Sequence, residues 1–572
     1  MKISELTPGL SVSPQLSLAD VGAAAALGFR SIIVNRPDDE EPGQPTSALT
    51  QAMAEQQGLG FAAIPVVPGK ISDADIAAFG AALESLEGPV LAYCRTGTRS
   101  ATLWALGAAS NLSVDAILKT TARAGYDLKS LRPRLEKRHG SDGTPPIPSR
   151  HDVVIIGGGA AGLATAASLL RRRAGLDIVV VEPREMHYYQ PGWTLVGGGV
   201  FDRWQTQRPM ADVMPKGVRW VRAAVAGFRP DLNEIILEDG SAIAYKVLVA
   251  APGIALDWRA IDGLEATLGR NGVTSNYLFD MAPYTWELVQ GLREGVALFT
   301  QPPMPIKCAG APQKAMYLAC DHWRRTGRLG SIDVHFDNAG PALFGVKEYV
   351  PPLMDYVERY GIDLDFGSTL VAVDGDARRA TFRRSEGEVT LDFDMIHVCP
   401  PQKAPAFIAQ SPLAAPSGFI DVDQQTLRHA RYGNVYGLGD ACSATNAKTA
   451  AAARKQAPVV AVNVLATLDG KEPHAIYDGY GSCPLTVERG KIVLAEFGYN
   501  GVLQPSFPPW MIDGTRPSRL SWLLKEKALP WIYWNAMLKG REWLAGPTVL
   551  PHAPTPHVSA SNPNGVPAGR VG

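Results

Sequence analysis

Residues 152–170, "DVVIIGGGAAGLATAASLL", and residues 176–182, "LDIVVVE", decide the fold of the larger part of this chain. The apolar run before the glycines predicts a buried β-strand, and the Ala- and Leu-rich run after them predicts a helix. The second stretch predicts another buried strand. A strand, a Gly-rich turn, a helix and a second strand in this order are typical of a nucleotide-binding unit with a parallel sheet.

Three closely spaced glycines fill the turn of this unit, namely Gly157, Gly159 and Gly162. They permit a tight turn and let backbone N–H groups approach a pyrophosphate at the start of the helix. Glu182 lies twenty residues after Gly162, where an acidic side chain accepts hydrogen bonds from an adenosine ribose. The pattern predicts a bound dinucleotide; the alternative is the same Gly-rich turn in a fold that binds none.

Length and composition restrict the class of protein. The chain has 572 residues, which favours two to four domains, and its formal net charge of −1 gives no support for nucleic-acid binding. The 6 cysteines are too few for a disulfide scaffold, and no pair has metal-ligand spacing, so no metal site is predicted. The N-terminus lacks the pattern of a signal peptide, and no apolar run approaches the ~18 residues of a spanning helix. We therefore expect a cytoplasmic protein with reduced cysteines, in which any disulfide is catalytic.

The chain divides into four regions by pattern. Residues 1–125 alternate short apolar strands with helical stretches, which predicts a small α/β domain. Residues 126–150 are polar, basic and rich in Pro and Gly, which indicates a linker. A second α/β pattern covers residues 151–547, and residues 548–572 form a Pro-, Gly-, Ser- and Asn-rich tail that we expect to be disordered.

A second glycine-containing element distinguishes FAD from a lone NAD. In "NVYGLGDACSATNAKTAAAARKQ" a strand ends at Asp440 and a small-residue helix begins near Lys448. This element resembles the one that holds the ribityl chain of FAD in flavoproteins with two dinucleotide domains. Lys448 and Thr449 are candidates for stabilising the negative charge of reduced flavin; a plain helix charge and an N-cap are the alternatives.

A cysteine-containing turn stands where an NAD(P)H-dependent flavoprotein would carry a second fingerprint. After the strand "GVALFT" the chain reads "QPPMPIKCAGAPQK", whose prolines are poorly suited to cradling a pyrophosphate. NAD(P)H is therefore not expected as the electron donor. Cys308 lies beside Lys307 and before a predicted helix, which favours the thiolate. Cys442 follows Asp440, so two thiols beside a flavin would form a disulfide that a sulfur nucleophile can attack.

The other three cysteines of this part, Cys320, Cys399 and Cys483, are expected to be structural.

These residues together resemble one family, the sulfide:quinone oxidoreductases, in the branch that includes the mitochondrial enzyme. The motifs that carry the resemblance are "HYYQPGWTLVGGG", "PIKCAGAPQKAMYL", "ALFGVKEY", "IHVCPPQ", "GLGDACSATNAKTAAA", "YDGYGSCPL" and "VLAEFGY". The resemblance implies bound FAD, oxidation of sulfide to sulfane sulfur, and a membrane quinone as electron acceptor. It places the first redox cysteine at Cys308. The second falls at Cys442, although Ala441 here separates that cysteine from the Gly-Asp pair.

The segment 515–546 contains tryptophans interspersed with lysines and arginines, as in "LSWLLKEKALPWIYWNAMLKGREWLAG". Aromatic bodies with basic heads at this density suit a helical segment that lies in a membrane interface. Two amphipathic helices that pack on the core of the domain are the alternative. The family resemblance favours membrane contact, peripheral and on the inner face of the membrane.

The N-terminal region carries a loop that surrounds one sulfur. In "PVLAYCRTGTRSATLWAL" Cys94 opens the loop after a strand and Arg99 closes it at the start of a helix. Backbone N–H groups and a guanidinium around a thiol favour the thiolate as nucleophile. Four residues separate Cys94 from Arg99. This spacing resembles that of the tight loop in rhodanese-type sulfurtransferases, whereas five residues separate the two in protein tyrosine phosphatases.

Residues 1–110 as a whole are similar to small phosphatase-fold domains found beside sulfur-metabolism genes or fused to hydrolases. Asp38 or Asp39 could serve a phosphatase as general acid, but an acidic turn is the preferred explanation. Sulfur transfer is the preferred prediction, with a phosphatase and a non-catalytic domain as alternatives.

The combined prediction is an α/β protein with two Rossmann-like domains, a phosphatase-like N-terminal domain and C-terminal amphipathic helices. It would oxidise sulfide with FAD and quinone, for sulfide detoxification, and Cys94 would relay the sulfane sulfur to an acceptor such as glutathione or sulfite. One alternative is an NADPH-dependent persulfide or disulfide reductase with a sulfurtransferase domain. The other is a membrane-associated flavoprotein sensor with a phosphatase-like domain.

Overall fold

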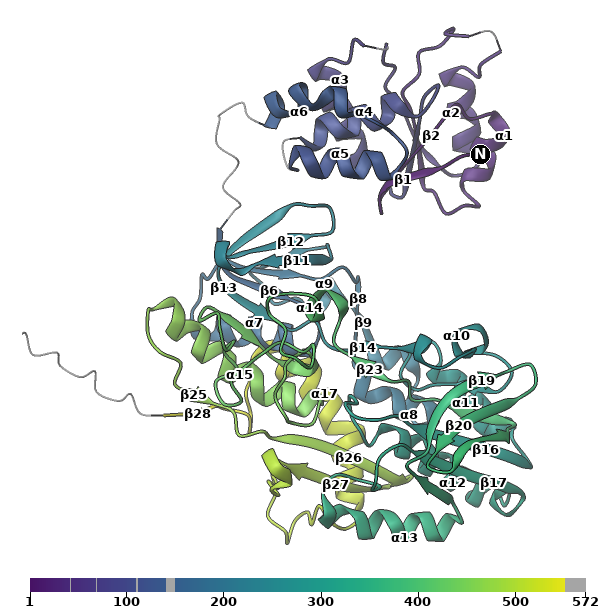
Figure 1. Cartoon of the computed structure of the whole chain (residues 1–572), viewed down its shortest axis with the longest axis vertical. Helices are drawn as coiled ribbons and strands as arrows, with labels where there is room; N and C mark the ends of the chain where they lie inside the picture. The colour runs from purple at the N-terminus through teal and green to yellow at the C-terminus, as the bar shows by residue number, and fades with distance from the viewer. Residues whose placement is uncertain (42, 68, 110–111, 140–149, 551–572) are drawn as a thin grey trace, which may run out of the picture. The chain divides into compact units, whose positions relative to one another are not determined.

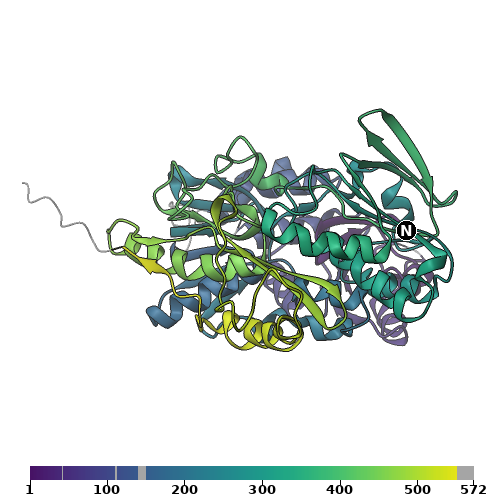
Figure 2. The ribbon, with the colours of Figure 1, turned by 90° about the horizontal axis from the view of Figure 1, so that it is seen from below.

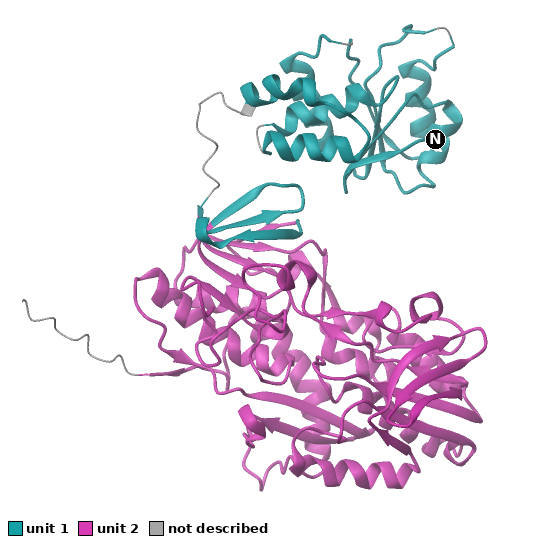
Figure 3. Cartoon of the chain, in the orientation of Figure 1, with its two compact units in different colours: residues 1–150, 223–244 teal, residues 151–222, 245–572 magenta. Residues whose placement is uncertain are grey.

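The computed structural model describes residues 1–41, 43–67, 69–109, 112–139 and 150–550. The chain forms two compact units, one of residues 1–150 and 223–244 and the other of residues 151–222 and 245–572 (Figure 3). Both are α/β structures, as the sequence predicts.

The first unit contains a five-stranded sheet of order β1-β2-β5-β3-β4 (Figure 1). The strands are β1 (Ser4–Thr7), β2 (Leu10–Ser13), β3 (Ser31–Val34), β4 (Gly60–Ala63) and β5 (Val90–Tyr93). All pairings are parallel except that of β1 with β2. The helices are α1 (Leu18–Ala24), α2 (Ser47–Gln56), α3 (Asp73–Ser85), α4 (Thr98–Ala108), α5 (Val114–Arg123) and α6 (Arg132–His139).

Helices cover both faces of this sheet. Alternate residues of β3 point to opposite faces, so Ile32 packs in one core cluster and Ile33 in the other. Helices α1 and α2 contribute to the first cluster, and α3 to α6 contribute to the second. Because the sheet is buried on both sides, its strands read as continuous apolar runs.

Part of the predicted linker, residues 126–150, belongs to the first unit, and this is a correction. Lys129–Leu131 form a 3₁₀ turn and α6 follows directly. Leu135 of α6 is fully buried in the core of the first unit, so this segment completes the domain. Residues 140–149 lie outside the described part of the chain.

A sheet of order β10-β7-β6-β13-β12-β11, with β24 also paired to β13, carries the predicted nucleotide-binding unit. Its strands are β6 (Arg150–Ile156), β7 (Ile178–Val181), β10 (Val218–Val221), β11 (Val225–Arg229), β12 (Glu234–Leu237), β13 (Ala242–Ala250) and β24 (Val435–Gly437). Helix α7 (Ala160–Arg172) joins β6 to β7, which are parallel. The stretch quoted first therefore forms the strand, turn, helix and strand that it predicts.

A second parallel sheet has the order β15-β22-β16-β17-β18. Its strands are β15 (Val273–Thr274), β16 (Gly295–Gln301), β17 (Ile332–Asn338), β18 (Asp363–Phe366) and β22 (Met395–His397). The larger helices near it are α11 (Ala282–Gly291), α12 (Ala311–Arg325) and α13 (Val350–Tyr360), and β19 (Thr369–Asp374), β20 (Arg379–Arg384) and β21 (Gly387–Asp392) form a separate antiparallel sheet. Short elements include β8 (Met186–Tyr188), α8 (Trp193–Gly197), β9 (Gln207–Pro209), α9 (Met210–Val213), β14 (Ala255–Leu256), α10 (Leu264–Thr267), β23 (Gln402–Lys403) and α14 (Ala406–Ala409).

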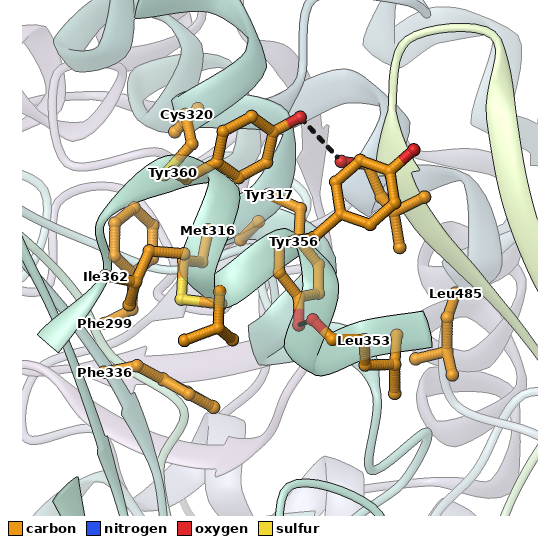
Figure 4. Packing of buried hydrophobic residues seen from close by; sticks show 14 of the residues in the cluster. Phe299, Met316, Tyr317, Cys320, Phe336, Leu353, Tyr356, Tyr360, Ile362 and Leu485 are labelled. Atoms are coloured by element: carbon orange, nitrogen blue, oxygen red, sulfur yellow. Dashed lines mark hydrogen bonds between the residues drawn. The ribbon is translucent and has the colours of Figure 1, made fainter. Parts of the chain in front are cut away.

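Helix α12 is buried almost from end to end and organises a large core cluster. Phe299 of β16 and Phe336 of β17 pack below it, and tyrosines of α12 and α13 pack beside it (Figure 4). The Tyr317 hydroxyl donates to the carbonyl of Leu353 at 3.1 Å, which satisfies a buried polar group.

An antiparallel hairpin, β26 (Gly481–Glu488) and β27 (Lys491–Phe497), closes this core from the other side. Figures 1 and 2 show it extending between α15 (Ala450–Leu468) and α12, both of which it contacts. Leu485, Val487 and Val493 of the hairpin belong to the same cluster as α12. This packing brings residues of β26 to the beginning of α12.

The C-terminal helices are α16 (Arg519–Leu523), a π-helical turn (Leu524–Ala528), α17 (Leu529–Asn535) and a 3₁₀ turn (Met537–Lys539). Within the described residues, none of the helices is long and apolar enough to cross a membrane. The predicted tail starts too early, because β28 (Thr548–Val549) pairs with β25 (Ala475–Ile476). Residues 551–572 of that tail lie outside the described part of the chain.

Candidate functional site

The predicted dinucleotide turn has a geometry that requires glycine and leaves room for a ligand. Gly157 has φ +99°, and a Cβ at Gly162 would overlap the carbonyl oxygen of Gly157. Gly159 caps α7 without a side-chain hydrogen bond, and no heavy atom lies within 4 Å of its Cβ position. The Cβ direction of Gly159, at the start of α7, is therefore open, which fits the close approach of a dinucleotide pyrophosphate to the helix N-terminus.

Glu182 lies at the end of β7, beside this turn. Its carboxylate accepts hydrogen bonds from the N–H of Gly158 at 2.8 Å and of Arg184 at 2.9 Å. The structure thus brings all four predicted residues of the fingerprint together.

The second predicted element lies at the end of β24. Burial raises the pKa of Asp440, and the charges of Lys448 and Lys307 oppose that effect. Thr449 is the N-cap of α15, and its hydroxyl accepts the N–H of Ala452 at 3.1 Å. The ammonium of Lys448 donates to the carbonyl of Cys442 at 2.9 Å. These contacts match the alternative roles given above, in which Lys448 supplies a helix charge and Thr449 an N-cap.

Cys308 lies just before α12 in a left-handed conformation with φ +51°. This conformation costs a residue with a Cβ roughly 1–2 kcal/mol. Two backbone hydrogen bonds hold it: its N–H donates to the carbonyl of Lys448 at 2.8 Å, and its carbonyl accepts the N–H of Ala311 at 2.7 Å. The thiol is therefore fixed between the beginnings of α12 and α15.

The thiol that faces Cys308 is Cys483, not Cys442. The two sulfur atoms of Cys308 and Cys483 are 3.7 Å apart. Gly310 allows this approach, because a Cβ there would lie 2.7 Å from the sulfur of Cys483. Hairpin β26–β27 carries Cys483 onto the start of α12, so the expectation that Cys483 is only structural does not fit its position.

Cys442, the predicted partner of Cys308, occupies a different environment. It ends the turn Gly439–Ala441, and its sulfur lies 3.3 Å from the carbonyl of Gly439. Burial raises the pKa of this thiol. Among the described residues no cysteine sulfur other than those of Cys308 and Cys483 has a sulfur partner.

Two buried lysines surround the sulfur pair. Lys314, on the first turns of α12, places its ammonium 3.0 Å from the sulfur of Cys308. Lys525, from the π-helical turn, is 3% exposed and donates to the carbonyl of Pro191 at 3.3 Å. Burial and the charge of Lys314 lower the pKa of Lys525 to about 7, so this side chain changes charge near neutrality.

The electrostatics make Cys308 the thiolate of the pair. A hydrogen bond from Cys483, together with the charge of Lys314, holds the pKa of Cys308 well below its usual range. That hydrogen bond and burial raise the pKa of Cys483 well above it. The two thiols titrate as one coupled system, in which the first proton leaves Cys308.

The sequence indicated Lys307 as the neighbour that favours this thiolate, but its ammonium donates to the side chain of Gln190 at 2.7 Å. Sequence reasoning missed Lys314, Lys525 and the role of Cys483. Lys314 could have been found, since it lies six residues after Cys308 on the predicted helix. Nothing local to Lys525 or Cys483 indicates that either lies beside Cys308.

Replacing Lys314 with methionine is expected to raise the pKa of the Cys308 thiol by about one to three units, because an opposite charge in contact is removed. The pH dependence of Cys308 alkylation by iodoacetamide, followed by mass spectrometry, measures this. Lys307→Met is the control, with an expected shift below about one unit. A larger shift in Lys307→Met than in Lys314→Met would contradict the assignment.

The first unit holds the second predicted site. Cys94 follows β5 and is fully buried, and Gly97, with φ +86°, caps α4. Arg99, on the first turn of α4, donates to the carboxylate of Glu40 at 2.7 Å and to the carbonyl of Val66 at 2.8 Å. The loop therefore joins β5 to the start of α4, with the guanidinium of Arg99 held by the carboxylate of Glu40.

Several neighbours of this loop were not predicted or are explained differently. A Cβ at Gly97 would overlap the hydroxyl of Tyr126, so that tyrosine supports the loop from within the predicted linker. Asp38 accepts the N–H of Ser47 at 2.7 Å at the start of α2, and Asp39 has φ +58°. Both fit the acidic turn better than a general acid.

The tryptophans of the C-terminal segment divide into two groups. Trp522 and Trp534 are buried, and Trp534 packs against His187 and Tyr189. Trp531 and Trp543 are 49% and 50% exposed and stack with ring centroids 5.6 Å apart. The segment both packs on the core and presents aromatic surface to solvent.

Comparison with known proteins gives relatives for both units. A family model described as pyridine nucleotide-disulphide oxidoreductase matches residues 151–280, and one for the phosphatase-like domain of beta-lactamase hydrolase-like proteins matches residues 2–111. The chain is 41% identical over 410 residues to the mitochondrial sulfide:quinone oxidoreductase of Dictyostelium discoideum, a match that covers 71% of this chain and 90% of that protein.

The N-terminal part is 42% identical over 109 residues to the beta-lactamase hydrolase-like protein of Agrobacterium fabrum, which covers 19% of this chain and 25% of that protein. The crystal structure of the sulfide:quinone oxidoreductase from Aquifex aeolicus matches with a TM-score of 0.57 and 18% identity. That match covers 67% of this chain and 92% of the other, and it shows a likeness of fold.

Proposed function

The chain belongs to the sulfide:quinone oxidoreductase family, and from this premise we propose that its second unit oxidises sulfide to sulfane sulfur at Cys308 and Cys483, with a quinone as electron acceptor. The family prediction made from the sequence motifs is confirmed. The observation that carries the assignment of the residues is the 3.7 Å approach of the two sulfur atoms beside the ammonium of Lys314.

The contact of Lys314 with Cys308 supports an assignment of the sulfur that sulfide attacks once the pair is a disulfide. In thiol–disulfide exchange the sulfur with the lower pKa leaves faster. Cys308 is that sulfur, so hydrosulfide attacks the sulfur of Cys483. A bond forms between Cys483 and the incoming sulfur, the bond between the two cysteines breaks, and Cys308 leaves with the electron pair as a thiolate facing Lys314.

The thiolate of Cys94 then takes the outer sulfur, which leaves Cys483 as a thiol, and passes it on to an acceptor such as glutathione or sulfite. Restoring the disulfide from the Cys308 thiolate and the Cys483 thiol releases two electrons and one proton. Bound FAD would accept those electrons and pass them to quinone. The residues that would hold it are Gly157, Gly159, Gly162, Glu182 and Asp440, with Lys448 and Thr449 at the start of α15.

Two glycine variants test the dinucleotide site. Gly162→Ala places a methyl group on the Gly157 carbonyl and is expected to destabilise the protein by about 1–3 kcal/mol as well as lower its flavin content. Gly159→Ala meets open space, so the flavin-free protein should keep its thermal midpoint. The Gly159→Ala variant should nonetheless bind flavin about tenfold more weakly, which corresponds to a loss of ~1.4 kcal/mol of binding free energy. Equal flavin affinity in Gly159→Ala and wild type would refute the placement of the pyrophosphate.

The proposed function itself is tested by an anaerobic absorbance titration of the flavin. Sulfide is added to one sample and NADPH to another, and a soluble quinone is then added to both. Bleaching by sulfide and recovery on addition of quinone are the expected results. Bleaching by NADPH instead would support the reductase alternative, since it would require a nucleotide to bind at the proline-rich turn before α12.

For the first unit we propose sulfur transfer at Cys94, with the persulfide held by the loop that Arg99 closes. The four-residue spacing and the contact of Arg99 with Glu40 support this, because the carboxylate offsets the positive charge that a phosphate dianion would need. Tethering to the flavin unit raises the effective concentration of the relay partner.

Membrane contact at the inner face, through the C-terminal segment, completes the proposal. Five apolar side chains there are about half exposed or more, namely Leu520, Leu523, Trp531, Trp543 and Leu544. Exposed apolar side chains with exposed basic side chains in the same segment suit interfacial attachment, and a quinone dissolves in the membrane that this segment would touch.

A further inference from the structure

An open pocket of about 660 Å³ lies between the end of α7 and the segment that follows the C-terminal helices. Its lining residues are Arg171, Arg172, Gly540, Arg541, Glu542, Trp543 and Gly546. The pocket is built by close packing, because a Cβ at Gly540 would lie 2.6 Å from the carbonyl oxygen of Ala167 and 2.7 Å from Cδ of Arg171. It takes no part in the sulfur chemistry described above.

The pocket carries positive charge that the protein does not neutralise. The carboxylate of Glu542, which lines the pocket, already accepts hydrogen bonds from the guanidinium of Arg172 at 2.7 Å and from the hydroxyl of Ser168 at 2.7 Å. Neither Arg171 nor Arg541 forms a side-chain ion pair or hydrogen bond with any described residue. The carbonyl end of α7 contributes only about half an elementary negative charge, so two guanidiniums leave the pocket cationic.

The rim of the pocket is apolar and aromatic. Trp543 lines it and stacks on Trp531, and Leu544, the next residue, is 72% exposed. The side chain of Arg454 donates to the carbonyl of Trp543 and so fixes this part of the rim. A phosphodiester with attached hydrocarbon matches both parts: its charged oxygens suit paired guanidinium groups, and its chains suit the indoles and the leucine.

We propose that this pocket binds the phosphate of an anionic phospholipid, with Arg171 and Arg541 as the groups that contact the headgroup. The inference rests on the proposed membrane contact and deepens it, because it adds a headgroup preference to an apolar attachment. Its location beside Trp531 and Trp543 would orient the C-terminal segment on the membrane surface.

The test measures sedimentation of the full-length holoprotein with vesicles of phosphatidylcholine alone and of phosphatidylcholine mixed with phosphatidylglycerol. The double variant Arg171→Gln/Arg541→Gln should lose about 10- to 30-fold in affinity for the mixed vesicles, from two cationic contacts near an anionic surface. Its binding to phosphatidylcholine alone should stay within about twofold of wild type. The thermal midpoint and the reduction of a soluble quinone by sulfide establish that the variant folds.

The matched control is Arg219→Gln/Arg293→Gln, which removes the same charge from two exposed arginines that do not line the pocket. It should cost less than about threefold in affinity for the mixed vesicles, since exposed charges away from the surface are screened. Equal losses in both double variants, or none in the pocket variant, would overturn the proposal. Tight binding of inorganic phosphate that the pocket variant abolishes would reassign the pocket to a soluble anion. Failure of the wild type to bind either vesicle would refute the membrane contact itself.

Discussion

Replacing Cys483 with serine is expected to slow the reduction of bound flavin by sulfide by on the order of 10³-fold or more, as removal of an essential nucleophile does in other enzymes. Cys308→Ser should have the same effect, because the two sulfur atoms lie 3.7 Å apart and form one disulfide in the proposed cycle. Cys442→Ser should retain the rate within about threefold, since its sulfur faces the carbonyl of Gly439. Anaerobic stopped-flow absorbance of the flavin measures all three.

Cys442→Ser is the matched control, because both buried thiols belong to the flavin unit and their replacement removes the same atom. A large loss in Cys442→Ser with a small one in Cys483→Ser would restore the pair that the sequence predicted. A serine hydroxyl forms no persulfide. Mass spectra of Cys483→Ser treated with sulfide should therefore show no sulfane sulfur bound at residue 483. Cys308→Ser should retain one reactive thiol at Cys483 and no disulfide.

Cys94→Ser is expected to abolish the sulfur-transfer activity of the first unit, by about 10³-fold or more, while sulfide still reduces the flavin at the wild-type rate. The reason is that Cys94 is the thiol of the loop closed by Arg99, which lies in the first unit, whereas Cys308 and Cys483 lie in the second. Formation of thiosulfate from sulfide and sulfite, with a soluble quinone as oxidant, measures the transfer. Hydrolysis of p-nitrophenyl phosphate is assayed in parallel.

Asp38→Asn separates the two chemistries of this loop. Asp38 accepts hydrogen bonds from the N–H and the hydroxyl of Ser47, so its replacement should leave sulfur transfer within about threefold of wild type. Phosphate hydrolysis that depends on both Cys94 and Asp38, without sulfur transfer, would instead establish the phosphatase alternative. Unchanged thiosulfate formation in Cys94→Ser would contradict a relay through the first unit.

The sequence by itself determined the features that a short stretch of chain encodes. The turn between β6 and α7 follows from Gly157 and Gly162, where a Cβ would overlap backbone atoms, and Glu182 follows from the length of one βαβ unit. The loop from Cys94 to Arg99 is likewise a strand end and a helix start joined by four residues. In each case the backbone hydrogen bonds and sterics of neighbouring residues fix the geometry, so the pattern alone is sufficient.

The tertiary structure decided which groups meet across the chain. Cys308 and Cys483 are 175 positions apart, and they meet because the apolar face of hairpin β26–β27 packs on α12. Lys525 reaches the same place from the C-terminal helices, and Tyr126 supports the Cys94 loop from a segment whose composition resembles a linker. No local sequence pattern encodes contacts between residues so far apart in the chain. The reason is that burial of apolar surface has no preferred direction, so many well-packed arrangements would bury the same side chains. Only the complete core selects one, and it placed Cys483, not Cys442, opposite the reactive thiolate.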